Sequence, residues 1–176
     1  AGGLPLVPAM LDRCFVAPDR PVQAFGLHFR NPVGLAAGYD KDALGWRGLA
    51  HLGFGHLEVG TVTPRPQPGN PSPRLFRLVE EQAVINRMGF PGKGGRFVVR
   101  ALMRPRPPGL VLGVNIGKNK DTALEDAAQD YILLLRQFWS LADYLTINVS
   151  SPNTPGLRSL QTRSALEALL RPLDAE

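Results

Sequence analysis

The chain has 176 residues, of which 44% are apolar and 20% are charged. This composition is ordinary for a soluble globular domain with a core of its own. No run approaches the roughly 20 apolar residues of a membrane span, and the start lacks the basic and apolar segments of a signal peptide. The single cysteine, Cys14, excludes an internal disulfide framework and a cysteine metal cluster. With only three scattered histidines, His28, His51 and His56, no metal site is predicted.

The net charge of +5 and the pI near 9.9 favour affinity for anions. The densest positive group consists of Arg96, Arg100, Arg104 and Arg106. No aromatic residues are interleaved with them, as a platform for single-stranded nucleic acid would require. We therefore interpret these arginines as a solvated surface, and we expect no specific nucleic-acid partner.

Residues 1–30 form an irregular, proline-rich segment with one short alternating piece, "VQAFGLHF", that could pair as a hairpin strand. Four later runs are almost continuously apolar, which is typical of parallel strands buried on both faces. These predicted strands span residues 33–37, 56–61, 110–115 and 144–149.

Helical patterns lie between and after these runs. The clearest spans Asp121–Ser140, where Thr122 and Glu125 form a possible capping box. Its predicted inward face consists of Leu124, Ala128, Tyr131, Leu135 and Phe138.

Two further helices are predicted. One spans Leu44–Leu52 and ends at Gly53, and the other opens at Ser164 with Glu167 in its first turn. The predicted inward residues of the latter are Leu166, Leu169, Leu170 and Leu173.

Strands that alternate with helices predict an α/β fold with a parallel sheet. Residues 64–110 interrupt this alternation. They begin with the stiff loop "TPRPQPGNPSPR", and two short strands are expected around Glu80–Gln82. We expect this excursion to cover the end of a strand of the sheet.

Each predicted strand ends in polar or glycine-rich sequence: "AAGYDKD", "GTVTP", "NIGKNKD" and "NVSSPNTPG". Each ending alone could be a simple turn. Together they predict one shared site, because ligands bind at the carboxyl ends of parallel strands. The polar residues expected there are Lys41, Thr61, Asn115, Asn148, Ser151 and Asn153.

The usual nucleotide motifs are absent from these endings. "GVNIGK" is one residue short of a P-loop, and Asn119 stands where that motif has Ser or Thr. A site rich in amides and hydroxyls, with one lysine and close backbone approach at Ala37–Gly38, suits a flat polar heterocycle.

Five segments closely resemble one family: "NPVGLAAGYDKDA", "GFGHLEVGTVTPRPQPGNPSPRLFRL", "AVINRMGF", "LGVNIGKNKDT" and "DYLTINVSSPNTPGLRSLQ". They are similar to the N-terminal half of dihydroorotate dehydrogenase, of the quinone-dependent class 2, over roughly residues 24–163. The resemblance implies an oxidoreductase acting on a CH–CH bond, in which FMN lies in a (β/α)8 TIM-type barrel. It also implies oxidation of dihydroorotate to orotate in pyrimidine (UMP) biosynthesis, with membrane quinone as the electron acceptor.

The resemblance also implies binding roles for individual residues. The positions that match flavin-binding residues are Ala37, Gly38, Lys41, Thr61, Asn115 and Asn148. The positions that match substrate-binding residues are Lys41, Asn86, Arg87, Met88, Gly89, Phe90, Asn148 and Asn153.

Ser151 matches the catalytic base that removes the C5 proton while hydride leaves C6. Thr154 and Phe90 match residues of a proton relay from that serine, and Arg77 matches an arginine at the quinone tunnel. A serine hydroxyl is a weak base, so this role needs a dry, preorganised site and an onward path for the proton.

The family barrel has eight strands, whereas four are recognised here. We therefore expect residues 31–176 to form the first half of the FMN-binding barrel. Residues 1–30 are then a remnant of the membrane extension and of the hairpin at the barrel bottom, without a convincing amphipathic helix. Open sheet edges predict poor stability and little activity for this fragment alone. Peripheral association with the cytoplasmic side of a bacterial cell membrane is implied by the class alone.

Two alternatives stay open. The chain could be a non-catalytic half-barrel that pairs with a second half, although it keeps every site residue expected in this half. It could also belong to the soluble, fumarate- or NAD-linked class. Ser151, where that class has cysteine, and the "FRL" segment count against the second alternative.

Overall fold

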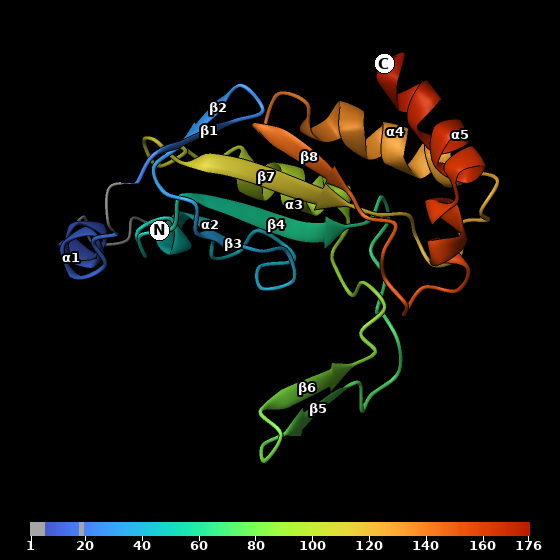
Figure 1. The fold of residues 1–176 in the computed structure, drawn as a ribbon, viewed down its shortest axis with the longest axis horizontal. Helices are drawn as coiled ribbons and strands as arrows, with labels where there is room; N and C mark the ends of the chain where they lie inside the picture. The colour runs from blue at the N-terminus through green and yellow to red at the C-terminus, as the bar shows by residue number, and fades with distance from the viewer. Residues whose placement is uncertain (1–5, 18–19) are drawn as a thin grey trace.

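The centre of the molecule is a four-stranded parallel sheet with the strand order β3-β4-β7-β8 (Figure 1). The computed structural model describes residues 6–17 and 20–176, so residues 1–5 and 18–19 of the predicted N-terminal segment lie outside the described residues. The strands are β3 (Gly34–Leu35), β4 (His56–Val62), β7 (Val111–Ile116) and β8 (Tyr144–Ile147). All four predicted strands and their parallel order are confirmed.

Helices follow the strands along the chain. They are α2 (Trp46–Leu49), α3 (Gly95–Leu102), α4 (Ala127–Phe138), the short 3-10 helix η1 (Leu157–Gln161) and α5 (Arg163–Asp174). Helix α4 packs on β7 and β8, α2 packs on β4, and α5 packs on α4. This arrangement of parallel strands with helices against the sheet is that of a partial (β/α)8 barrel, as predicted.

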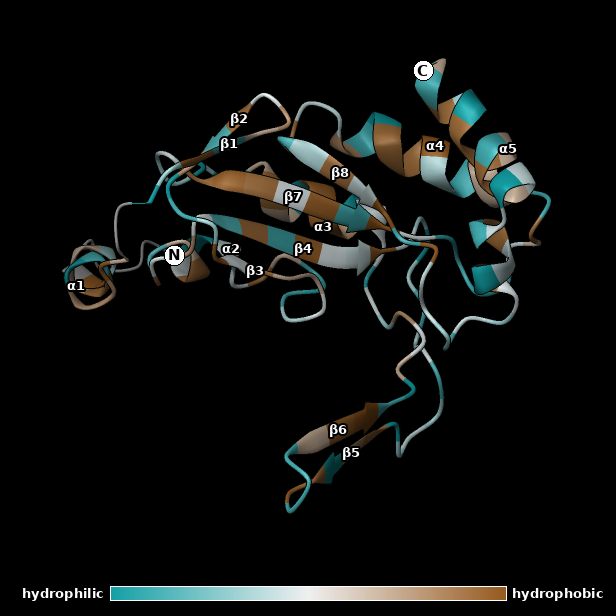
Figure 2. Cartoon of the chain, in the orientation of Figure 1, coloured by the Kyte–Doolittle hydropathy of each residue, from teal (hydrophilic) through white to brown (hydrophobic). Residues whose placement is uncertain are grey.

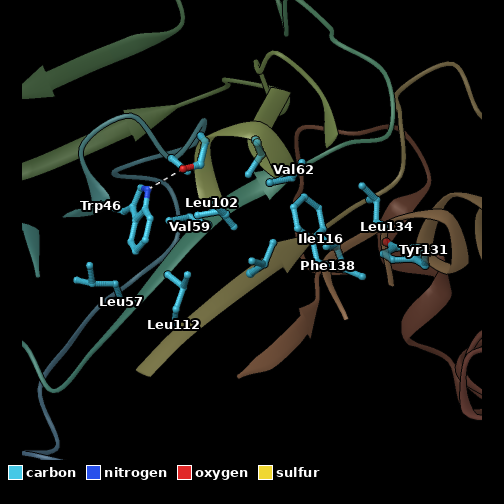
Figure 3. Close-up of a cluster of buried hydrophobic side chains, with 14 of the residues drawn as sticks. Trp46, Leu57, Val59, Val62, Leu102, Leu112, Ile116, Tyr131, Leu134 and Phe138 are labelled. Atoms are coloured by element: carbon cyan, nitrogen blue, oxygen red, sulfur yellow. Dashed lines mark hydrogen bonds between the residues drawn. The ribbon is translucent and has the colours of Figure 1, made fainter. Parts of the chain in front are cut away.

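The hydrophobic core lies between the sheet and its helices (Figure 3). Alternate residues of each strand face the helices, which is why Leu57 and Val59 of β4 are buried together with Leu112 of β7. The helices contribute Trp46, Val98, Leu102, Tyr131, Leu134 and Phe138. The Trp46 indole also donates a hydrogen bond of 3.4 Å to the Ala101 carbonyl of α3. Burial of each large side chain contributes about 1.5–3 kcal/mol.

Helix α4 begins later than predicted, and the predicted capping box is wrong. The helix starts at Ala127, and the Thr122 hydroxyl instead donates a hydrogen bond of 2.7 Å to the Asp130 carboxylate. The inward face is consequently rotated: Ala127 and Leu134 are buried with Tyr131 and Phe138. Three residues of the predicted inward face are only half-buried, namely Leu124, Ala128 and Leu135.

The other two predicted helices also have different bounds. Helix α2 covers only Trp46–Leu49, because the Asp40 carboxylate binds the N–H groups of Leu44 and Gly45 at 2.8 and 2.9 Å in a turn. Helix α5 begins at Arg163, so Ser164 lies inside it rather than before it. Of its predicted inward residues, Leu169 and Leu173 are buried, whereas Leu166 is half-buried and Leu170 is exposed.

Two antiparallel hairpins flank the sheet. The first pairs β1 (Val22–Ala24) with β2 (Leu27–Phe29), which confirms the hairpin pattern of "VQAFGLHF". The second pairs β5 (Leu75–Leu78) with β6 (Ala83–Asn86), as predicted, and projects away from the sheet (Figure 1).

The short helices α1, α3 and η1 were not predicted. Helix α1 (Leu6–Cys14) corrects the expectation that the first residues contain no helix. Its proline, Pro8, is tolerated because N–H groups of the first turn have no helical partner. Helix α3 (Gly95–Leu102) was missed although its buried residues Val98, Ala101 and Leu102 recur at the spacing of one helix face. In the described residues, no helix has the length and apolar character needed to cross a membrane.

The arginines interpreted as a solvated surface lie on and after α3. Arg96, Arg100 and Arg104 are exposed, which agrees with that interpretation. Arg106 is also exposed, and it forms an ion pair of 2.6 Å with Asp143 at the start of β8. The positive charge therefore lies on the outside of the helical layer.

Candidate active site

The carboxyl ends of the parallel strands meet at one edge of the sheet, where a cavity of about 510 Å³ opens. Its volume lies in the range of small-molecule sites. Most of the predicted site residues line this cavity, namely Ala37, Gly38, Lys41, Thr61, Asn86, Met88, Gly89, Phe90, Asn115, Asn148, Ser151 and Asn153. Strands that are far apart in sequence thus bring the predicted residues together.

A continuous hydrogen-bond network joins the ends of β4, β7 and β8. The Thr61 hydroxyl donates to Asn115 Oδ1 at 2.6 Å. The Asn148 amide donates to the same oxygen at 3.1 Å and to the Thr61 hydroxyl oxygen at 2.9 Å. Because each side chain is held by the other two, their donors and acceptors are preorganised at the cavity wall.

Glu58, in the middle of β4, is hydrogen-bonded to this network. Sequence reasoning missed this residue. One of its carboxylate oxygens accepts a hydrogen bond of 2.8 Å from the Asn115 amide, and the other accepts one of 2.8 Å from the Thr146 hydroxyl. Burial, followed by the charge and hydrogen bond of Glu58, raises the pKa of Tyr144.

Glu58, Asn115 and Thr146 lie on the sheet face opposite the helices, since they alternate with core residues such as Leu57 and Val59. The prediction that the strands are buried on both faces holds for β7 and is wrong for β8, whose four residues are all half-buried, and for His56 and Glu58 of β4. The signal that could have found this polar face was the alternation of polar and apolar residues in "HLEV" and "YLTI".

The backbone approaches the cavity closely near Gly38. Its φ is +107°, and its N–H donates to the Gly60 carbonyl at 2.7 Å. A Cβ on Gly60 would lie 2.4 Å from the Asn115 carbonyl oxygen, so a larger residue has no room there. A flat ligand can therefore lie against backbone at this point.

Lys41 supplies the positive charge of the cavity. Its ammonium donates a hydrogen bond to the Gly38 carbonyl. Burial lowers the pKa of Lys41, the nearby Asp42 carboxylate opposes this shift, and Arg74 adds to it.

Ser151 lies at the cavity wall directly after β8. Its hydroxyl oxygen accepts a hydrogen bond of 3.2 Å from the Asn153 N–H. The preceding segment is held by Tyr131 of α4, whose hydroxyl donates to the Asn148 carbonyl at 2.8 Å. Thr154 is buried but outside the cavity lining, and its hydroxyl has no hydrogen-bond partner within the described parts of the chain.

The segment 86–90 forms the wall opposite the sheet. The Asn153 amide donates to Asn86 Oδ1 at 3.3 Å, which links this wall to the loop that carries Ser151. Arg87 does not line the cavity, because its guanidinium donates to the Pro73 carbonyl at 3.0 and 2.9 Å. Arg77 is exposed on β5, outside the cavity. The expected cover over a strand end is thus formed by the base of the excursion, while its hairpin projects outward (Figure 1).

These residues fit a flavin. The close backbone approach at Gly38 and the amide network suit a planar ring with donors and acceptors in its plane. The residues that would hold it are Ala37, Gly38, Lys41, Thr61, Asn115 and Asn148.

Known proteins resemble the chain over nearly its whole length. The family model "Dihydroorotate dehydrogenase" matches residues 21–175. A relative from Roseiflexus sp. (strain RS-1), named dihydroorotate dehydrogenase (quinone), is 56% identical over 172 residues, which are 96% of this chain and 47% of the relative. A relative of the same name from Alkalilimnicola ehrlichii is 60% identical over 87% of this chain and 45% of its own length.

The fold comparison gives the same result. The crystal structure of DHODH from Eimeria tenella in complex with ferulenol matches with a TM-score of 0.83 and 41% identity, over 97% of this chain and 49% of that chain. The chain spans about half the length of the curated relatives it matches. The chain belongs to the dihydroorotate dehydrogenase family.

Proposed function

We propose that this chain contributes the first half of an active site that oxidises (S)-dihydroorotate to orotate with FMN as cofactor, in pyrimidine (UMP) biosynthesis. The observation that carries this proposal is the cavity at the strand ends, where Ser151 and the amide network face the segment 86–90. A site of this kind provides a base and in-plane hydrogen bonds for a planar ring on the wall at the strand ends, and the segment 86–90 closes the opposite side.

Ser151 removes the C5 proton of the substrate through its hydroxyl oxygen. The acceptor for the hydride from C6 would be FMN, held by Ala37, Gly38, Lys41, Thr61, Asn115 and Asn148. Thr154 is suited to receive the proton next, because its buried hydroxyl has an unused donor and acceptor within the described parts of the chain. Phe90 lies in the cavity wall and restricts water around that path.

The amides and Lys41 orient the substrate. Asn86, Asn148 and Asn153 can each donate and accept, which matches the imide-like edge of the pyrimidine. Lys41 attracts the carboxylate of dihydroorotate and the negative charge that develops on reduction of the cofactor. Met88 and Gly89 complete the wall, and Arg87 supports it through the Pro73 carbonyl.

Quinone is the proposed electron acceptor, since the curated relatives are named for it. Arg77 is proposed to contact the quinone from β5, beside the exposed apolar side chains of the hairpin. Peripheral association with the cytoplasmic side of a bacterial cell membrane belongs to the same proposal. The soluble class is less well supported, because these relatives carry the quinone name.

The first experiment measures the visible absorption spectrum of the purified chain before and after anaerobic addition of dihydroorotate. A flavin spectrum that bleaches would show that the chain builds a working site. A colourless chain would leave the test to a hybrid enzyme, in which this chain replaces the matching segment of the Roseiflexus sp. relative. Dihydroorotate-dependent reduction of quinone by the hybrid enzyme supports the proposal. A folded, flavin-loaded hybrid without this activity refutes it and favours the non-catalytic half-barrel.

A further inference from the structure

Gln67 lies in the proline-rich loop, and its side-chain amide joins one wall of the site to the loop that follows β7. Its Nε2 group donates to the carbonyls of Gly89 and Phe90 at 3.1 and 3.0 Å. Its Oε1 atom accepts from the Asn119 amide at 2.9 Å and from the Lys120 N–H at 3.0 Å. The two carbonyls can only accept and the Lys120 N–H can only donate, so the orientation of this amide is unambiguous.

Asn119 completes the bridge from the end of β7. It is 1% exposed, and its Oδ1 accepts from the Arg65 N–H at 2.9 Å while its Nδ2 donates to the Arg65 carbonyl at 3.0 Å. Asn119 is the residue that breaks the P-loop pattern in the sequence. In the structure, its side chain instead binds the backbone of Arg65, at the start of the segment 64–110 that leaves the barrel.

The base of the bridge is buried and extensively hydrogen-bonded. The Asn119 N–H donates to the Asp130 carboxylate of α4 at 2.9 Å. The Lys118 ammonium, on a residue that is 1% exposed, donates to the carbonyls of Asn119 and Thr122 at 3.1 and 2.7 Å. Buried charged hydrogen bonds of this kind hold a loop in one conformation.

The other end of the bridge holds a backbone that needs support. Phe90 has a φ of +51°, a strained conformation for a residue with a side chain. A Cβ on Gly117 would lie 3.3 Å from the Phe90 ring, so this ring packs directly on the loop after β7. Asn70 links the proline-rich loop to the loop that carries Ser151, since its side-chain amide donates to the Asn153 carbonyl at 3.3 Å.

We propose that Gln67 and Asn119 are positioning residues: their amide bridge holds the segment 86–90 at the correct distance from Ser151 for substrate binding. Neither side chain lines the cavity, so both act through the segment they hold. The part of this proposal that concerns substrate rests on the proposed function, whereas the part that concerns the segment does not.

The test uses Gln67→Met, which keeps the length of the side chain and removes both donors. In the 176-residue chain, we expect amide hydrogen exchange in residues 87–93 to accelerate about tenfold or more, from the loss of two hydrogen bonds. Exchange in α3 should not change. Asn119→Asp, which loses the donor to Gln67, should accelerate exchange in the same segment. The matched control is Gln129→Met, since the side-chain amide of Gln129 is at the surface and donates to the exposed Asp126 carboxylate.

The second measurement is made in the hybrid enzyme. Gln67→Met should weaken orotate binding about tenfold and leave FMN binding within twofold. The reason is that the bridge holds the segment 86–90, which is proposed to bind substrate, and none of the residues proposed to bind flavin. A merely structural role would weaken both. Unchanged exchange in residues 87–93 overturns the bridge, and equal losses of orotate and FMN overturn its positioning role. If the unsubstituted, flavin-loaded hybrid binds no orotate, the proposed function and the substrate part fail together, while the exchange result still decides the bridge.

Discussion

In β7 every residue from Val111 to Ile116 is buried, whereas every residue of β5 and β6 is exposed, although both regions are rich in apolar side chains (Figure 2). Strand β7 has a paired strand on each side and helix α4 packed against it. The two strands of the hairpin pair only with each other in the described chain. Apolar sequence therefore produces a strand in both places, but only the surrounding elements decide whether it forms core.

The two regions also differ in how their polar groups are arranged. The ends of β4, β7 and β8 are joined by side-chain hydrogen bonds that fix the cavity wall. The hairpin is fastened at its base, where the Arg74 guanidinium binds the carbonyls of Pro68 and Asn70. Its tip carries exposed apolar residues such as Val79, at 81% exposure, and Val84, at 59%. A cluster of this kind is typical of an interaction surface, in keeping with the proposed quinone contact.

The largest expected effect is chemical. Ser151→Ala in the hybrid enzyme should lower kcat about 10²- to 10⁴-fold, because it removes the proposed general base. Orotate binding should change less than threefold, since among the described residues the Ser151 hydroxyl makes one hydrogen bond, which it accepts from the Asn153 N–H. Steady-state quinone reduction and an orotate titration measure the two quantities. Ser164→Ala, at an exposed position in α5, is the control. A Ser151→Ala enzyme with undiminished kcat would exclude the serine as base.

The next effect compares the same substitution in the two regions. Leu112→Ala in β7 should lower the free energy of unfolding by about 2–5 kcal/mol, because it leaves a cavity at a site that is 0% exposed. Leu78→Ala in the hairpin, at a site that is 36% exposed, should cost about 1 kcal/mol or less. Urea denaturation of the chain measures both. Equal losses would mean that the hairpin is covered in solution.

A smaller loss of stability is expected at Gly113, whose missing side chain leaves space for the Tyr144 ring. A Cβ on Gly113 would lie 2.2 Å from the Tyr144 ring, so Gly113→Ala should destabilise the chain by about 1–3 kcal/mol. Gly48→Ala is the matched control, since nothing lies within 4 Å of its added Cβ and the residue is helical. The control should be neutral or stabilising by up to about 1 kcal/mol. Thermal unfolding of the two variants separates crowding from the general effect of removing a glycine.

The smallest effect is a change in pH dependence. Burial, with the charge and hydrogen bond of Glu58, raises the pKa of Tyr144 above its ordinary value of 10.0. The folded chain then holds this proton where the unfolded chain loses it. The resulting stability is complete below pH 10 and is lost as the pH rises further. Tyr144→Phe should make that alkaline loss shallower in urea titrations between about pH 9 and 11. Tyr39→Phe, at a ring that is 73% exposed, is the control, and equal slopes in both variants would contradict the assignment.

Sequence reasoning located the site because of a geometric rule. Asn115, Asn148 and Ser151 each follow an apolar run, and parallel strands bring such endings to one edge. The rule says nothing about Glu58, which lies within β4, nor about Gln67, which lies in a loop. It also does not address the helices α1 and α3, because it concerns only strand ends; the signal for α3 was the helical spacing of Val98, Ala101 and Leu102. The division of the chain at residue 30 and the individual binding roles stay predictions.

By itself, the sequence determined the order of the strands, their parallel pairing, the polar residues at their ends and membership of the family. These features depend on local pattern, because a buried parallel strand needs a continuous apolar run and a turn needs polar or glycine residues. Only the tertiary structure decided the partners of Glu58, Gln67 and Asn119 and the opposite burial of β6 and β7. Many of these contacts join residues far apart in the sequence, such as Gln67 and Asn119, which are 52 positions apart and meet through the packing of whole elements.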